Sequence, residues 1–300
     1  MNWLWLALIA PAIYTVVMFL DKYVVEHKVS DYRGVPIYGA ITAAVAGTVI
    51  WLGSGQPSVA PATAFLILTA GFITLWAYVI YFHAIAKSEA SYIIAMLQLV
   101  PVFVLPLSYI LLGEVLSLWK IVGFLLVVVS ALALSVGKPS EKVRLNESFY
   151  LMLLTSLLIA LSFIVIKFAF IGKNDFVNVL IYESWGVATG GLVAFLLLKK
   201  VRRAFLESFN NVGGSVLGIM FTNEILFLVS KAITFLAIAL GSVAIVTALG
   251  STQVFYGILY GVILSTAFPK IFSEETAASQ VITKVSLAAI MFVGVWMVSV

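Results

Sequence analysis

The chain has 300 residues, of which 63% are hydrophobic and only 10% are charged. Soluble domains carry charge on about a quarter of their residues, so this composition excludes an ordinary soluble protein and predicts an integral membrane protein. The small net charge of +4 does not indicate nucleic-acid binding, and a sequence without cysteine excludes disulfides and thiolate metal sites.

Ten apolar runs follow one another along the chain, each near the roughly 20 residues that a helix needs to cross a bilayer. Glycine, proline or charged residues interrupt the sequence between them, as in Gly53–Pro57. We therefore expect an all-α integral membrane protein with ten transmembrane helices. The expected spans are residues 3–25, 35–53, 61–84, 91–112, 118–137, 148–171, 176–198, 214–239, 242–265 and 279–299.

The two halves of the chain resemble each other. Tyr81–Ser91 is echoed by Thr234–Ala244, and Ile37–Gly39 is echoed by Ile181–Glu183. A duplicated unit of five spans must cross the bilayer in two opposite orientations, and many secondary transporters are built from such inverted repeats. The sequence therefore predicts two inverted five-helix repeats.

A charged, proline-containing segment divides these repeats. We expect a first repeat over residues 1–138, a cytoplasmic linker over 139–147 and a second repeat over 148–300. Thirteen of the 17 Lys and Arg residues fall in odd-numbered connections, three fall on the other side, and Lys231 lies inside a span. We expect a multi-pass protein of the prokaryotic cytoplasmic (inner) membrane. By the positive-inside rule, both of its termini are expected on the outer side of that membrane.

The end of the third span and the fourth and fifth spans carry a recognisable set of short features. They are Tyr81 with Ala84, Ala90–Ser91, Gln98–Val102, Leu112–Glu114 and Gly123. This set resembles the EamA module of the drug/metabolite transporter superfamily. The resemblance implies a carrier made of two five-helix modules, and it implies transport without naming a substrate. The second half departs from the family pattern in a longer loop over residues 268–275.

Ionisable side chains inside a span are costly and usually mark a pathway. Glu224 lies near the middle of its span beside Asn223, and Lys231 follows seven residues later. That spacing separates Glu224 and Lys231 by about 10 Å along the helix, too far for a direct ion pair. Each should therefore meet another helix, a water-filled cavity or a substrate group. Glu224 is either a functional carboxylate or part of a structural ion pair.

Glu183 shares a helix face with Gly186, which favours close helix packing and an inward carboxylate. It is either functional or a structural hydrogen-bond acceptor. The repeat aligns Glu183 with Gly39 and Glu224 with Gly71, so the acidic groups at these positions occur in the second half alone.

Four uncharged residues complete the expected substrate- or proton-binding set. They are Tyr14, Trp76, Gln98 and Gln253, the two glutamines lying at similar levels of repeat-related spans. Asp21 is interpreted differently, as a partly solvated pair with Lys22 at the membrane boundary.

The function expected is secondary active transport, as an exporter or exchanger of a small organic metabolite or drug-like solute by alternating access. Protons are a possible coupling ion, and membrane lipids surround the chain. No metal, cofactor, nucleic-acid partner or enzymatic activity is expected, since the sequence carries no tight cluster of acid, base or nucleophile. A flippase for a lipid-linked head group and a non-transporting membrane assembly factor remain alternatives. Monomer and homodimer both stay open.

Overall fold

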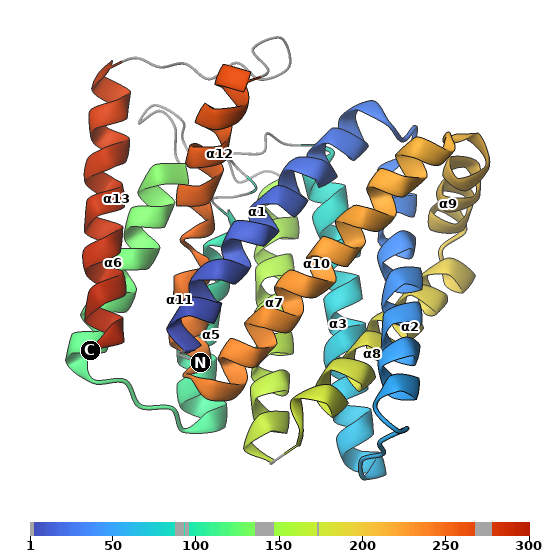
Figure 1. Cartoon of the computed structure of the whole chain (residues 1–300), viewed down its shortest axis with the longest axis horizontal. Coiled ribbons are helices and arrows are strands. Elements are labelled where there is room, and N and C mark those ends of the chain that lie inside the picture. The colour runs from blue at the N-terminus through green and yellow to red at the C-terminus, as the bar shows by residue number, and fades with distance from the viewer. Residues whose placement is uncertain (1–2, 88–92, 94–95, 136–146, 173, 268–277) are drawn as a thin grey trace.

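The computed structural model describes residues 3–87, 93, 96–135, 147–172, 174–267 and 278–300, and every element in these ranges is helical (Figure 1). The helices of the first half are α1 (Trp3–His27), η1 (Tyr32–Gly34), α2 (Val35–Gly53), α3 (Pro61–Ile85), α5 (Leu99–Leu112) and α6 (Leu118–Ser135). Those of the second half are α7 (Glu147–Ile171), α8 (Phe176–Leu197), α9 (Lys199–Asn211), α10 (Gly214–Leu240), α11 (Val243–Gly250), α12 (Gln253–Ala267) and α13 (Ala278–Ser299).

Within the described chain, 7 segments are long and apolar enough to cross a membrane. Shorter apolar helices match three further expected spans, at Leu99–Leu112, Leu118–Ala133 and Val285–Ser299. Such a set of apolar helices is that of a multi-pass membrane protein, whereas the number of ten spans stays a prediction. The expected linker, apart from Glu147, and the loop at 268–275 lie outside the described residues.

Two spans expected to be continuous are interrupted in the structure. In the span predicted over 242–265, α11 ends at Gly250 and α12 begins at Gln253. In the span predicted over 91–112, Gln98 is in a turn and α5 begins after it. At the interruption between α11 and α12, Thr252 Oγ1 donates to the backbone carbonyl of Leu249 at 2.7 Å. Irregular backbone is tolerated at membrane depth where it is buried in protein or lines a cavity. Residues of both interruptions line a cavity.

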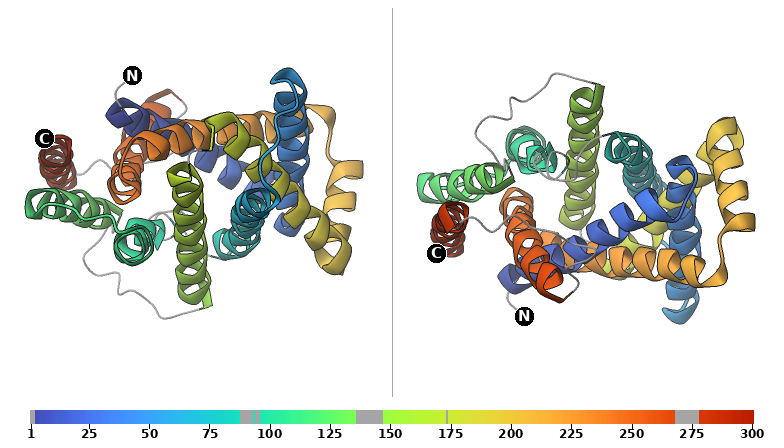
Figure 2. Two further views of the ribbon diagram at one scale, coloured as in Figure 1. Left: turned by 90° about the horizontal axis from the view of Figure 1, so that it is seen from below. Right: turned by 90° about the horizontal axis from the view of Figure 1, so that it is seen from above.

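Helices of the first half pack mainly against helices of the second half. The contacts pair α1 with α10, α2 with α8, α3 with α7 and α8, α5 with α7, and α6 with α13. The α6/α13 pair lies at one edge of the molecule and α9 at the opposite edge in all views (Figures 1 and 2). The interior is therefore walled by both halves.

The α3–α8 contact depends on glycine. A Cβ atom added to Gly71 would lie 2.0 Å from the carbonyl oxygen of Glu183, and one added to Gly186 would lie 2.2 Å from that of Leu68. Neither position has room for a side chain. The close packing predicted from Gly186 is confirmed, and it brings the backbone of Glu183 directly against α3.

Candidate functional site

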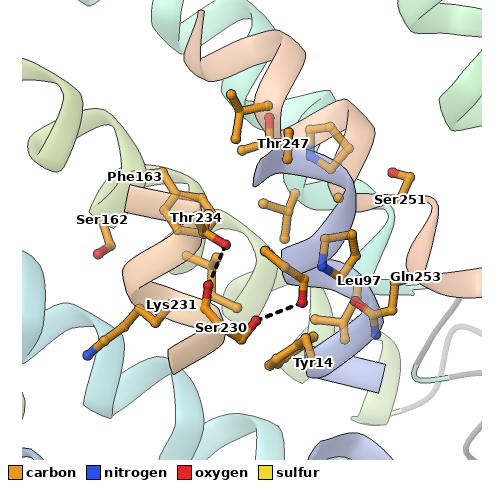
Figure 3. A pocket seen from close by; sticks show the side chains of 18 of the residues that line it. Tyr14, Leu97, Ser162, Phe163, Ser230, Lys231, Thr234, Thr247, Ser251 and Gln253 are labelled. Carbon is orange, nitrogen blue, oxygen red and sulfur yellow. Dashed lines mark hydrogen bonds between the residues drawn. The ribbon is translucent and has the colours of Figure 1, made fainter. Parts of the chain in front are cut away.

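A cavity of about 150 Å³, the larger of a pair that share lining residues, lies between α1, α3, α7, α10, α11 and the start of α5 (Figure 3). Four of the predicted site residues line it, namely Tyr14, Gln98, Lys231 and Gln253. Gln98 and Gln253 stand at the two helix interruptions. The breaks in the helices therefore open onto the cavity.

Most hydroxyl groups of this cavity are already bonded within the protein. Ser230 Oγ donates to the carbonyl of Ala10 at 2.8 Å, and Thr234 Oγ1 donates to that of Ser230 at 3.0 Å (Figure 3). The Thr74 and Ser162 hydroxyls bond to each other at 2.8 Å. The wall is thus largely neutral and apolar toward a ligand.

A smaller cavity of about 40 Å³ adjoins the larger one and is acidic. Tyr14, Tyr78, Phe227 and Lys231 line both cavities. The two tyrosine hydroxyls are 3.5 Å apart, and the Phe227 ring lies 5.0 Å from that of Tyr78. This aromatic cluster therefore forms the partition between a mainly apolar space and a charged one.

Lys231 pairs with Glu183 across two helices. Its Nζ lies 2.6 Å from Glu183 Oε2, and the two side chains are 5% and 0% exposed. Of the three environments expected for Lys231, the structure shows a partner on another helix. Glu183 is turned inward, and its second oxygen, Oε1, is buried without a hydrogen-bond partner among the described residues.

Asp21 corrects an expectation from the sequence. Instead of forming a solvated pair with its neighbour, it is buried and accepts a hydrogen bond of 2.8 Å from Asn223 Nδ2. Lys22 pairs with Glu26 at 2.6 Å. Adjacent helical residues point about 100° apart, so Asp21 faces α10 while Lys22 faces away. Its position seven residues after Tyr14, on the same helix face, is the signal that could have identified it.

Glu224 lies where α10 meets α2. A Cβ atom on Gly39 would sit 2.8 Å from Glu224 Oε2, so the Glu224 carboxylate lies directly against this glycine. Glu224 lines the smaller cavity with Asp21 and Asn223, and Asn223 Oδ1 is buried. In the part of the chain that the structure describes, neither Glu224 nor Asn223 Oδ1 has a polar partner for hydrogen bonding or ion pairing.

Of the two remaining predicted residues, Gln253 lines the larger cavity and Trp76 does not. Gln253 Nε2 donates to Met18 Sδ, and the Gln253 carbonyl accepts a bond from Thr15 at 3.3 Å, so this residue ties α12 to α1. Trp76 lines neither cavity and packs beside Phe72, with ring centroids 6.1 Å apart. The structure therefore brings together all the predicted site residues except Trp76.

Comparisons with known proteins show a family likeness and a shared fold. The sequence profile of the EamA-like transporter family matches residues 1–136. One similar crystal structure has a TM-score of 0.68 and 14% sequence identity, covering 98% of this chain and 94% of its own, which shows a shared fold. Among curated proteins there is no match. The matched profile is that of a family of transporters. The first 136 residues of the chain are thus similar to the EamA-like transporter family, which lies within the drug/metabolite transporter superfamily.

Proposed function

We propose that the chain is a secondary active transporter that exports or exchanges a small organic solute across the cytoplasmic membrane by alternating access. The observation that carries this proposal is a pair of adjoining cavities walled by both halves of the chain, one apolar and one acidic. The family match supports transport as the general activity. The two cavities support a solute site beside a coupling site.

The larger cavity is the proposed solute site. Its volume of about 150 Å³ matches that of an engineered protein cavity that binds benzene, so a small organic molecule fits. Aromatic and apolar walls with a few polar groups are typical of small-molecule sites. Gln98 and Gln253, at the helix interruptions, are the proposed polar contacts that orient the solute.

The charges of the smaller cavity and its ion pair do not balance. Asp21, Glu183 and Glu224 are three carboxylates, and Lys231 is the one ammonium group among the described residues that line the cavities. An uncompensated charge inside a membrane costs at least about 2.5–3.5 kcal/mol. Protons or a cationic solute group would compensate the excess negative charge.

This imbalance supports coupling by competition. If a proton and a cationic solute group bind the same carboxylates, each displaces the other and each biases the same conformational equilibrium. Alternating exposure of the site then converts the competition into antiport. Glu224 is the proposed proton carrier, and Asp21 is its partner across the cavity.

The glycine contacts support the inverted repeat on which alternating access depends. Gly39 abuts Glu224, and Gly71 abuts the backbone of Glu183. The sequence repeat aligns Gly39 with Glu183 and Gly71 with Glu224. A two-fold axis in the membrane plane would therefore exchange one contact for the other, as expected for inverted repeats.

Proteoliposomes with an imposed pH gradient and an internal pH-indicator dye test the coupling. A panel of labelled amines, amino acids and sugars serves as the set of probe solutes. For any solute that the unmodified chain accumulates, Glu224→Gln should retain exchange of that solute and lose gradient-driven accumulation. Asp21→Asn should weaken accumulation in the same assay.

Glu26→Gln is the matched control, since Glu26 is a carboxylate of α1 that pairs with Lys22 outside both cavities. It should accumulate the solute like the unmodified chain. Unchanged accumulation in Glu224→Gln would remove Glu224 as proton carrier and leave a solute exchanger. If no probe moves in the unmodified chain while labelled lipid head groups cross the bilayer, the flippase alternative replaces the solute carrier.

A further inference from the structure

The segment between α8 and α10 is an amphipathic helix, α9. Leu198 alone separates α9 from α8, and two residues separate it from α10. Because α8 and α10 are both long and apolar enough to cross a membrane, these short connections place α9 at the level where they leave it. The helix runs along the outer edge of the molecule (Figures 1 and 2).

One face of α9 is docked on the protein. Val201, Ala204, Phe205 and Ser208 are buried. A Cβ atom on Gly34 would lie 2.6 Å from the backbone nitrogen of Phe205, so the chain of η1 touches the backbone of α9 directly. This close contact fixes which side of α9 faces outward.

The Tyr38 side chain of α2 strengthens the docking. Its hydroxyl donates a bond of 3.1 Å to Ser208 Oγ, and its ring lies 5.0 Å from that of Phe205. Tyr38 is itself 0% exposed. Because α2 holds this face of α9, the opposite face of the helix remains exposed.

The outward face combines cations with apolar side chains. Lys199, Lys200 and Arg203 are exposed, and so are Leu206 and Phe209, at 45% and 48%. At 100° per residue, Leu206 and Phe209 share one flank, with Lys199 and Arg203 next to it. Apolar residues flanked by cations are the pattern of helices that lie in the membrane interface.

We propose that α9 is an interfacial helix that binds anionic phospholipid. In this arrangement Leu206 and Phe209 enter the boundary of the acyl chains, while Lys199, Lys200 and Arg203 contact lipid phosphates. Two observations favour lipid over a protein partner. The charge is complementary to an anionic leaflet, and the apolar flank continues the exposed Leu196–Leu197 surface at the end of α8.

Hydrogen exchange of the α9 amides tests the proposal on the full chain in lipid nanodiscs. The probes are phosphatidylcholine alone and equal parts of phosphatidylcholine and phosphatidylglycerol. Exchange in α9 should be about tenfold slower with phosphatidylglycerol, because several cations then contact anionic head groups. Raised ionic strength should remove the difference, since the Debye length falls to about 3 Å at 1 M salt.

A variant carrying Lys199→Gln, Lys200→Gln and Arg203→Gln should lose the response to phosphatidylglycerol and keep its melting temperature in phosphatidylcholine. Glu207→Gln removes the acidic partner of Arg203 and should strengthen the response. Equal exchange of the unmodified chain in both lipids would overturn the proposal. A response that survives in the triple variant or at high salt would overturn it as well.

Discussion

Lys231 forms a buried ion pair and also lines the proposed solute site. It neutralises Glu183 at 2.6 Å while lining both cavities, and its ammonium also lies 5.7 Å from the centre of the Phe227 ring. Removing one member of a buried ion pair leaves an uncompensated charge, which destabilises far more than replacing both members. Substitution of Lys231 or Glu183 is therefore expected to lower the stability of the fold, whereas substitution of Glu224 is expected to affect transport.

Glu183→Gln should destabilise the protein by about 3–5 kcal/mol, because the Lys231 ammonium then stays buried without its carboxylate. Adding Lys231→Met should recover a large part of this loss. Thermal unfolding in detergent measures both variants. A double variant as unstable as Glu183→Gln alone would show that the ion pair is not the cause. Glu207→Gln, in the exposed pair with Arg203, serves as control and should change stability little.

At the scale of elements, small residues decide where helices can touch. The α3–α8 contact brings Gly71 against the backbone of Glu183, and this contact positions the carboxylate that pairs with Lys231.

Hydrogen bonds to a side chain of the first half also hold the α10–α11 turn. Glu114 accepts bonds from Ser242 Oγ at 2.7 Å and from the Val243 backbone N–H at 3.2 Å, so a carboxylate of the first half satisfies an N–H group at the start of α11.

Gly71→Ala should destabilise the protein by about 1–3 kcal/mol, since a Cβ atom 2.0 Å from a carbonyl oxygen forces α3 and α8 apart. Gly53→Ala is the matched control, because a Cβ atom at Gly53 has open space around it and should cause no loss. Melting temperatures of the two variants in the same detergent provide the comparison. Equal melting temperatures would show that α3 and α8 can separate without cost.

At the scale of the whole molecule, the connections fall at two ends of the helical bundle. The α2–α3, α5–α6 and α7–α8 connections lie at the end that holds the termini, while the α1–α2 connection and α9 lie at the other (Figure 1). Basic residues concentrate at the latter end, as in the Lys199–Arg203 segment. The positive-inside rule therefore predicts that α9 is cytoplasmic.

Single cysteines in this cysteine-free chain test that orientation. Asn210, in α9, and Ser54, after α2, are both exposed and lie at opposite ends of the bundle. In intact cells an impermeant thiol reagent should label Ser54→Cys and leave Asn210→Cys unlabelled, whereas a permeant reagent should label both. The reverse pattern would invert the orientation. Ser208 is unsuitable, since it is buried against Tyr38.

The sequence by itself determined the properties that follow from composition and local spacing. Long apolar runs require helices that satisfy their own backbone in a membrane, so the class of protein and most helix bounds could be predicted. The axial distance between Glu224 and Lys231 excluded a direct pair between them. The EamA-like pattern of the first half was likewise visible in the residues alone.

Only the tertiary structure decided which side of each helix faces which neighbour. Helix rotation depends on contacts between distant segments, so the pairing of Lys231 with Glu183 and the burial of Asp21 against Asn223 could not be derived from spacing. The interruption at Ser251 follows the same reasoning, because a helix can break in a membrane only where surrounding protein or a cavity accepts its backbone. Local sequence sets the helices, and packing between the halves sets the site.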